Sequence, residues 1–218
     1  MIMNVNNDLI FLGKGVSKYV VGFEGNVSMK NKKGIHIKAS GTKLSEICDE
    51  NIVSYDFEGN QTNNYDKKGS MEISFHTYLL NKYDINYVAH THPINTLKIV
   101  CSNHLNDFAN NRLFPDQVIF NGEKSVIIPY AKPGLELTEE IKSILDRYDE
   151  PPKLILLEKH GIITMGKTID KCIISTEICE KSAEIYLGAK LLGINFLNQV
   201  DIENLINDKN EKYRESKI

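Results

Sequence analysis

Two histidines at the end of an apolar stretch are the residues of this sequence best suited to metal chemistry. Residues 87–93 read Tyr-Val-Ala-His-Thr-His-Pro, so one residue separates His90 from His92. The stretch favours a β-strand, in which alternate side chains point to the same face, and both imidazoles can then reach one ion. Imidazole suits zinc and its first-row neighbours, and a catalytic zinc usually has three protein ligands and an open position. The pair therefore needs a third ligand.

The best candidate for the third ligand is His160, one of six histidines in the chain. It follows an aliphatic run at residues 154–157 that is typical of a buried strand, and Gly161 allows a sharp backbone turn directly after it. The alternative is a histidine in an ordinary turn at a strand end, because His-x-His pairs also occur in proteins that bind no metal. The three remaining histidines, in a short strand, a helix and a polar loop, are weaker candidates: His36, His76 and His104.

Glu72 is the carboxylate that this chemistry would use. It falls in the first turn of a helix predicted over residues 70–81, for which Ser70 would be the N-cap. An acidic residue at that position is routinely an exposed partner of the helix dipole. Near a metal, the same group could instead take a proton from a bound substrate.

A set of small and polar residues, each typical of a turn, could together bind an anion. Glycine amides, hydroxyl groups and a helix N-terminus are the usual parts of such a site. The residues are Gly25, Asn26, Ser40, Gly41 and Ser70.

Strand and helix patterns alternate irregularly along the rest of the chain. Helices are predicted at residues 9–22, 70–81, 93–100, 135–148, 169–192 and 201–218, the last of which frays. Strands are predicted at residues 26–29, 35–38, 51–57, 87–92, 153–158 and 162–165, with a hairpin formed by 117–120 and 125–128 around Asn121-Gly122. Without a regular βαβ alternation, we expect an α/β fold of the α+β type in a single domain over residues 1–218.

Composition and charge exclude several classes of partner. A net charge of -3 with mixed signs gives no electrostatic footprint for nucleic acid. No apolar run is long enough to span a bilayer, and the first 13 residues lack the pattern of a signal peptide. The four cysteines form no Cys-x-x-Cys pair, so we expect reduced thiols and a cytoplasmic protein.

The order of five short segments resembles that of the class II aldolase/adducin family. The segments are Gly-Asn-Val-Ser at 25–28, Ile-Lys-Ala-Ser-Gly-Thr at 37–42, Ser-Met-Glu at 70–72, His-Thr-His-Pro at 90–93, and Lys-His-Gly at 159–161 followed by Gly-Lys-Thr at 166–168. The resemblance spans residues 9–192. It implies a central, mainly antiparallel sheet flanked by helices on both sides. It also implies a homotetramer with fourfold symmetry and active sites at subunit interfaces.

The same resemblance implies a function in carbohydrate metabolism and a role for each residue. Zn²⁺, or another divalent transition metal, would be held by His90, His92 and His160, and Glu72 would be the acid/base. A substrate phosphate would bind around Gly25, Asn26, Ser40, Gly41 and Ser70. The expected protein is a zinc-dependent aldehyde-lyase that cleaves or forms a carbon-carbon bond in a small ketose phosphate or related hydroxy-ketone, through a zinc-stabilised enediolate.

Three positions depart from the family pattern. Met71 replaces a second small hydroxyl residue, Lys159 stands where asparagine is more usual, and the tyrosine that protonates a departing aldehyde has no match at residues 103–122. Epimerisation or dehydration of a sugar phosphate on the same metal site is therefore an alternative. A non-enzymatic binding role, as in the adducin branch, is a further one, although that branch tends to lose the metal histidines.

Overall fold

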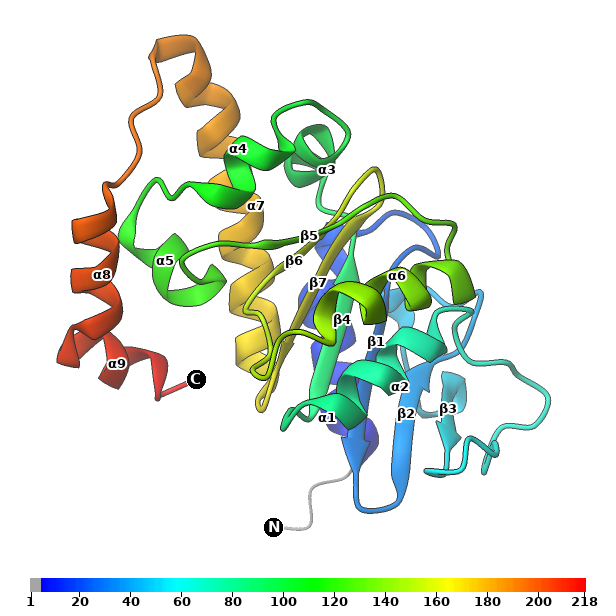
Figure 1. Cartoon of the computed structure of the whole chain (residues 1–218). Helices are drawn as coiled ribbons and strands as arrows, with labels where there is room; N and C mark the ends of the chain where they lie inside the picture. The colour runs from blue at the N-terminus through cyan, green and yellow to red at the C-terminus, as the bar shows by residue number, and fades with distance from the viewer. Residues whose placement is uncertain (1–4) are drawn as a thin grey trace.

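A seven-stranded sheet in the order β3-β2-β1-β4-β7-β6-β5 forms the centre of the molecule (Figure 1). The structure is a computed structural model and describes residues 5–218. The strands are β1 (Asn26–Asn31), β2 (Gly34–Lys38), β3 (Ile52–Tyr55), β4 (Tyr87–Thr91), β5 (Val126–Ile128), β6 (Ile155–Leu157) and β7 (Gly161–Gly166). Neighbouring strands are antiparallel except for β5 and β6, which are parallel. The prediction of a mainly antiparallel sheet is confirmed.

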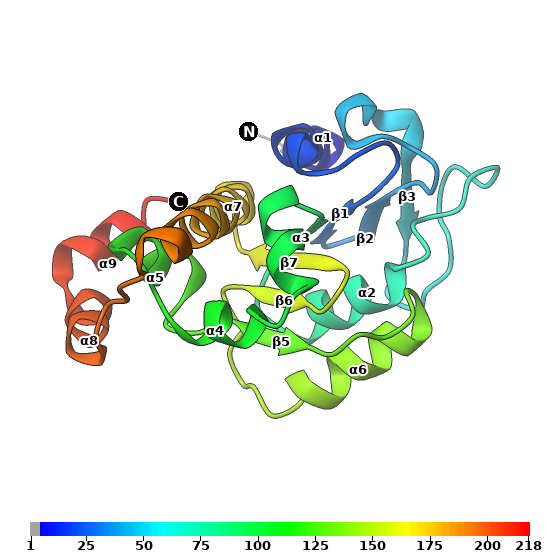
Figure 2. The ribbon, with the colours of Figure 1, turned by 90° about the horizontal axis from the view of Figure 1, so that it is seen from above.

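Helices cover both faces of this sheet, as predicted. They are α1 (Val5–Val16), α2 (Ile73–Lys82), α3 (Ile94–Val100), α4 (Leu105–Asn110), α5 (Pro115–Asn121), α6 (Leu135–Leu145), α7 (Ile169–Leu192), α8 (Gln199–Asn207) and α9 (Lys209–Glu215). Figure 2 shows α2 and α6 on one side of the sheet and α1, α3 and α7 on the other. None of the described helices is long and apolar enough to cross a membrane. A single domain over residues 1–218 stays a prediction.

Strand β4 is buried on both faces at the middle of the sheet. Val88 points into the apolar core under α2 and α6, whereas Tyr87 and Ala89 point into the core under α1. A strand covered on both sides is expected to be apolar throughout. His90 and Thr91 are therefore exceptional as fully buried polar residues of this strand, and His90 lies opposite Asn26 of β1 and Ile163 of β7.

The predicted hairpin at residues 117–120 and 125–128 is wrong. Its first half lies within helix α5, and its second half, β5, pairs in parallel with β6. Pro115 favours a helix start because its φ angle is already helical, and Gly122, with a φ of 82°, ends the helix. Asn121 then donates to the carbonyl of Ser175 on α7 at 2.9 Å. The Asn-Gly pair thus ends a helix instead of turning a hairpin.

Other helix boundaries also differ from the predictions. The helix predicted at residues 9–22 is α1 (Val5–Val16), and the one predicted at 135–148 ends at Leu145. Helix α2 begins at Ile73 with Glu72 at its N-cap, so Ser70 is not the N-cap residue. The tail forms two helices instead of one that frays, because the side chain of Asp208 accepts hydrogen bonds from the amides of Asn210 and Glu211 and starts α9.

Candidate active site

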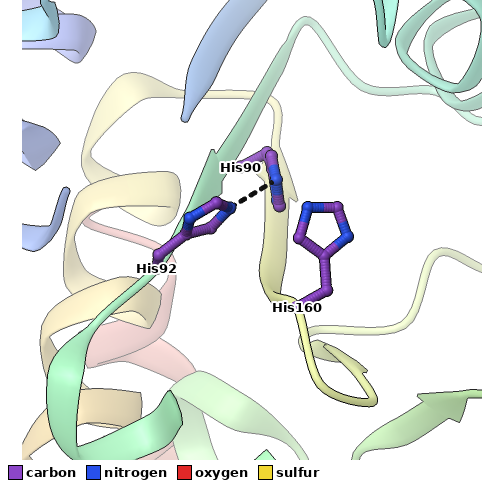
Figure 3. Close-up of side chains that lie close together, drawn as sticks. All are labelled: His90, His92 and His160. Atoms are coloured by element: carbon purple, nitrogen blue, oxygen red, sulfur yellow. Dashed lines mark hydrogen bonds between the residues drawn. The ribbon is translucent and has the colours of Figure 1, made fainter. Parts of the chain in front are cut away.

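Three histidines from two neighbouring strands of the sheet converge on one point (Figure 3). His90 lies in β4, His92 lies one residue beyond its end, and His160 directly precedes β7. Their possible ligand atoms all lie within 4.8 Å of one another. A Cβ atom on Gly161 would lie 2.5 Å from the carbonyl oxygen of Thr91 and 2.6 Å from the ring of His92. Glycine at 161 is therefore what lets the His160 turn approach β4 so closely.

The hydrogen-bond partner of His90 turns the lone pair of one ring nitrogen toward His92. Nδ1 of His90 lies 2.9 Å from the carbonyl oxygen of Ile162, which can only accept, so Nδ1 carries the proton. Nδ1 of His92 lies 3.4 Å from a carboxylate oxygen of Glu24. Nε2 of His90 therefore carries a lone pair, which faces Nε2 of His92 at 3.0 Å (Figure 3). A cation held by the three rings would take the place of that contact. Nδ1 of His160 is a further buried nitrogen, with no hydrogen-bond partner among the described residues.

Burial keeps all three imidazoles neutral. It lowers the pKa of His90 to about 3 and that of His92 to about 4, and a neighbouring histidine adds to each shift. Burial also lowers the pKa of His160, against the opposing charge of Glu72. Metal binding requires the neutral form of the ring. The donor set therefore fits a divalent transition metal without any further change of protonation.

Glu72 lies beside this histidine cluster and is not the exposed helix-dipole partner that was the alternative. Its side chain is buried, with Oε2 3.4 Å from Nε2 of His90 and Oε1 3.6 Å from Nε2 of His160. Oε2 accepts a hydrogen bond from Nδ2 of Asn26 at 2.8 Å, whereas Oε1 has no hydrogen-bond partner among the described residues. A carboxylate in this position can accept a proton from a molecule bound next to the histidines.

A cavity of about 270 Å³ opens next to Glu72, and every residue predicted to bind phosphate lines it. Gly41 has a φ of 75° and would meet nothing within 4 Å if it carried a Cβ, so its backbone borders open space. The lining residues are Phe23, Glu24, Gly25, Asn26, Lys38, Ser40, Gly41, Ser70, Met71, Glu72, His92, Pro133 and His160.

Lys38 is a residue of this cavity that the sequence patterns missed. It is 2 % exposed, and its ammonium group donates to the carbonyl oxygens of Phe23 at 3.0 Å and Thr42 at 2.6 Å. Burial lowers its pKa to about 8, although Glu72 opposes the shift. The only local signal is its position in an alternating strand two residues before Ser40-Gly41. The cavity thus contains one cation beside glycine amides and hydroxyl groups, which suits an anionic ligand.

Comparison with known proteins defines the family. The family described as "Class II Aldolase and Adducin N-terminal domain" matches residues 15–187. The chain is 32% identical over 169 residues to the L-fuculose phosphate aldolase of Methanococcus maripaludis strain C5, covering 77% of this chain and 86% of that protein. This protein therefore belongs to the class II aldolase/adducin family, which confirms the resemblance seen in its motifs.

A solved structure gives the fold of a similar protein, and a further relative carries the name of a different reaction. A solved structure of an L-fuculose 1-phosphate aldolase has a TM-score of 0.79 and 22% identity, covering 98% of each chain, which establishes the same fold. The 3-oxo-tetronate 4-phosphate decarboxylase of Pectobacterium atrosepticum is 25% identical over 190 residues, covering 86% of this chain and 84% of that protein. Membership of the family thus leaves more than one reaction open.

Proposed function

We propose that this protein is a metal-dependent aldolase that cleaves or forms a carbon-carbon bond in a small ketose phosphate. The observation that carries the proposal is the convergence of three neutral histidines and one buried carboxylate beside a cavity that contains a buried lysine. His90, His92 and His160 would hold the ion. Zn²⁺, or another divalent transition metal, would supply Lewis acidity for the negative charge that develops on the substrate oxygens.

Glu72 would move the proton that the reaction requires. When the carbon-carbon bond breaks, its electron pair stays with the ketose fragment, whose carbon must then gain a proton. Glu72 can take a proton from a substrate hydroxyl and return it to that carbon, since Oε1 has no hydrogen-bond partner among the described residues. No lysine Schiff base is required, because Lewis acidity replaces it.

The substrate phosphate would bind on the side of the cavity formed by loops. Lys38 would supply the positive charge, since a pKa of about 8 leaves most of its amine protonated at neutral pH. Gly25, Ser40, Gly41 and Ser70 would add amides and hydroxyl groups, and Asn26 would add an amide hydrogen. Met71 offers no hydroxyl group at this cavity, so the phosphate would be held by fewer donors on that side.

Decarboxylation of a phosphorylated keto-acid is a second candidate. The lining residues of the cavity that the structure describes include no tyrosine, so this chain offers no phenol there to exchange a proton with the aldehyde oxygen. Loss of CO₂ leaves the same kind of carbanion and needs no such acid. The Pectobacterium atrosepticum relative carries the name of this type of reaction.

We also propose that the protein forms a homotetramer and is located in the cytoplasm. Phe23 and Met71 line the cavity yet are 62% and 71% exposed, which suits a second copy of the chain covering its mouth. Gel filtration with light scattering would measure the assembly. A monomer at working concentrations would contradict the tetramer without bearing on the metal site.

The experiment that tests the function is a screen of ketose 1-phosphates, with L-fuculose 1-phosphate first, using metal-loaded protein. We expect dihydroxyacetone phosphate and an aldehyde in equal amounts. Release of CO₂ from a phosphorylated keto-acid would favour decarboxylation, and a product that keeps every carbon would favour epimerisation or dehydration. No turnover of any ketose 1-phosphate by protein with bound metal would overturn the aldolase proposal.

A further inference from the structure

His76 is a fully buried polar residue for which the proposed reaction has no direct use. It lies on α2 one turn after Glu72, with 0% exposure, and its ring stacks on that of Phe75 at 4.5 Å between centroids. A buried imidazole requires hydrogen-bond partners for both nitrogens. Those partners come from strand β1, 48 and 50 residues away along the chain.

The partners form a continuous chain of hydrogen bonds that ends on the carboxylate of Glu72. Ser28 Oγ lies 2.6 Å from Nδ1 of His76, and Nε2 of His76 contacts Oδ1 of Asn26. Nδ2 of Asn26 then lies 2.8 Å from Oε2 of Glu72. All four residues are at most 5% exposed, so no bulk water competes with these bonds.

The chemistry of the groups fixes the direction of every bond. An ionised carboxylate only accepts, so the Asn26 amide must turn Nδ2 to Glu72 and Oδ1 to His76. Oδ1 also only accepts, so Nε2 of His76 must carry the proton. Burial holds the pKa of His76 well below its ordinary value, so the ring is neutral and Nδ1 accepts from the hydroxyl of Ser28.

This direction gives the two oxygens of Glu72 different tasks. Oε2 accepts a hydrogen bond from Nδ2 of Asn26, and His76 sets the orientation of that amide. A proton on Oε2 would therefore point at the N–H group of Asn26, which is unfavourable. Oε1 has no hydrogen-bond partner among the described residues. Oε1 is therefore the oxygen available to receive a proton.

We propose that His76, acting through Asn26, is a positioning residue that anchors Oε2 of Glu72 and leaves Oε1 to carry the proton. The proposal rests on the proposed function, since it assigns the geometry of that acid/base. Asn26 has a second amide hydrogen and lines the cavity, so it can also donate to a bound substrate. The side-chain amide of Asn26 would then donate one hydrogen bond to Glu72 and another to the substrate.

The test compares His76→Leu, which removes both polar nitrogens, with His76→Gln, whose side-chain amide can still donate to Asn26. His76→Leu is expected to lower kcat about 100-fold with KM little changed, because a misplaced group costs about that much. Metal content should stay as in the wild type. His76→Gln should restore most of kcat. An unchanged kcat in a folded His76→Leu, or a His76→Gln no better than His76→Leu, would overturn the proposal.

A matched control is available on β2. His36 is also a buried histidine whose Nδ1 contacts a serine hydroxyl, Ser54 Oγ at 2.7 Å, but it does not line the cavity. His36→Leu should therefore leave kcat and KM unchanged. If His76→Leu does not fold, Ser28→Ala replaces it. Loss of the hydroxyl that donates to Nδ1 would leave this buried nitrogen without a partner, which should lower kcat and leave KM unchanged; an unaltered kcat would contradict the proposal.

A measurement without substrate separates this proposal from the proposed function. Long-range ¹H–¹⁵N NMR of the histidine rings in the wild-type protein reports which nitrogen carries the proton, and Nε2–H is expected for His76. Nδ1–H would overturn the hydrogen-bond chain whatever the reaction. A different result would overturn the proposed function: metal-loaded protein that has Nε2–H on His76 but turns over no sugar phosphate. The hydrogen-bond chain would then stand, but without its role in that reaction.

Discussion

The histidine cluster and the loop residues of the cavity are built in different ways. His90, His92 and His160 come from the ends of β4 and β7, where the backbone is fixed by the sheet. Gly25, Ser40, Gly41 and Ser70 come from three connections, and two of them are glycines with left-handed φ angles of 65° and 75°. Strand ends hold side chains more precisely than loops do.

We expect the histidine cluster to determine the reaction and the loop residues of the cavity to determine the substrate. The histidine cluster with Glu72 would serve an aldolase, a decarboxylase or an epimerase equally well, because each must stabilise negative charge next to a carbonyl group. The loop residues, with Lys38 and Met71, would decide which anion fits. Variants of the cluster should therefore remove activity on every substrate, whereas variants of the loop side should change affinity.

The largest effect is expected from His92→Ala. Removal of one of three ligands should reduce the bound metal from about one ion per chain to almost none and abolish turnover. Elemental analysis measures the bound metal, and the ketose phosphate assay measures turnover. His104→Ala, at a histidine in contact with Lys190 and outside the cavity, is the control and should keep both. Full activity in metal-free His92→Ala would refute the metal site.

Glu72→Gln should keep the metal and lose the chemistry. An amide of the same shape cannot take up a proton, so kcat should fall about 10²- to 10⁴-fold. KM should change little, because no substrate contact other than the proton transfer is assigned to Glu72. The check is steady-state kinetics with metal content measured on the same sample. Loss of the metal together with activity would instead make Glu72 part of the metal site.

Lys38→Met should affect affinity more than turnover. The variant removes a charge-assisted contact while filling the same volume, so KM for a phosphorylated substrate should rise about 10- to 100-fold. Lys32→Met, at an exposed lysine in the turn between β1 and β2, is the control. If KM does not change in Lys38→Met, the substrate anion binds elsewhere or is not charged.

The smallest effect is a dependence of KM on pH in the wild-type protein. The pKa of Lys38 is lowered to about 8, so its charge is present below that pH and is lost as the pH rises through it. KM should therefore increase between about pH 7 and pH 9. The same profile in Lys38→Met should be flat over this range. A slope of equal size in both proteins would assign the titration to another group.

Sequence patterns predicted the histidine cluster better than its surroundings. The proposed ligands His90, His92 and His160 stand next to strand ends, where a period of two, Pro93 and Gly161 are all local signals. The irregular order of strand and helix patterns also predicted an α+β fold, whereas the sheet with helices on both faces was implied by the family resemblance. Helix α5 was not predicted, because Val118, Ile119 and Phe120 favour a strand locally. Contacts with α7 stabilise the helix instead.

The residues that were missed have distant partners. Lys38 was not recognised because a lysine in a strand is ordinarily exposed, and its burial depends on the carbonyl oxygen of Phe23, 15 residues upstream. His76 was only a weaker candidate for a ligand, and its role was missed because its partners Asn26 and Ser28 lie on another element. No periodicity within α2 could have indicated these bonds, since they depend on how α2 packs against β1.

The most direct test of the central claim is product analysis before and after removal of the metal. Wild-type protein treated with a chelator should release no dihydroxyacetone phosphate from its ketose 1-phosphate, and addition of Zn²⁺ or another divalent transition ion should restore equimolar release of two fragments. Equal rates of release with and without the metal would contradict the account.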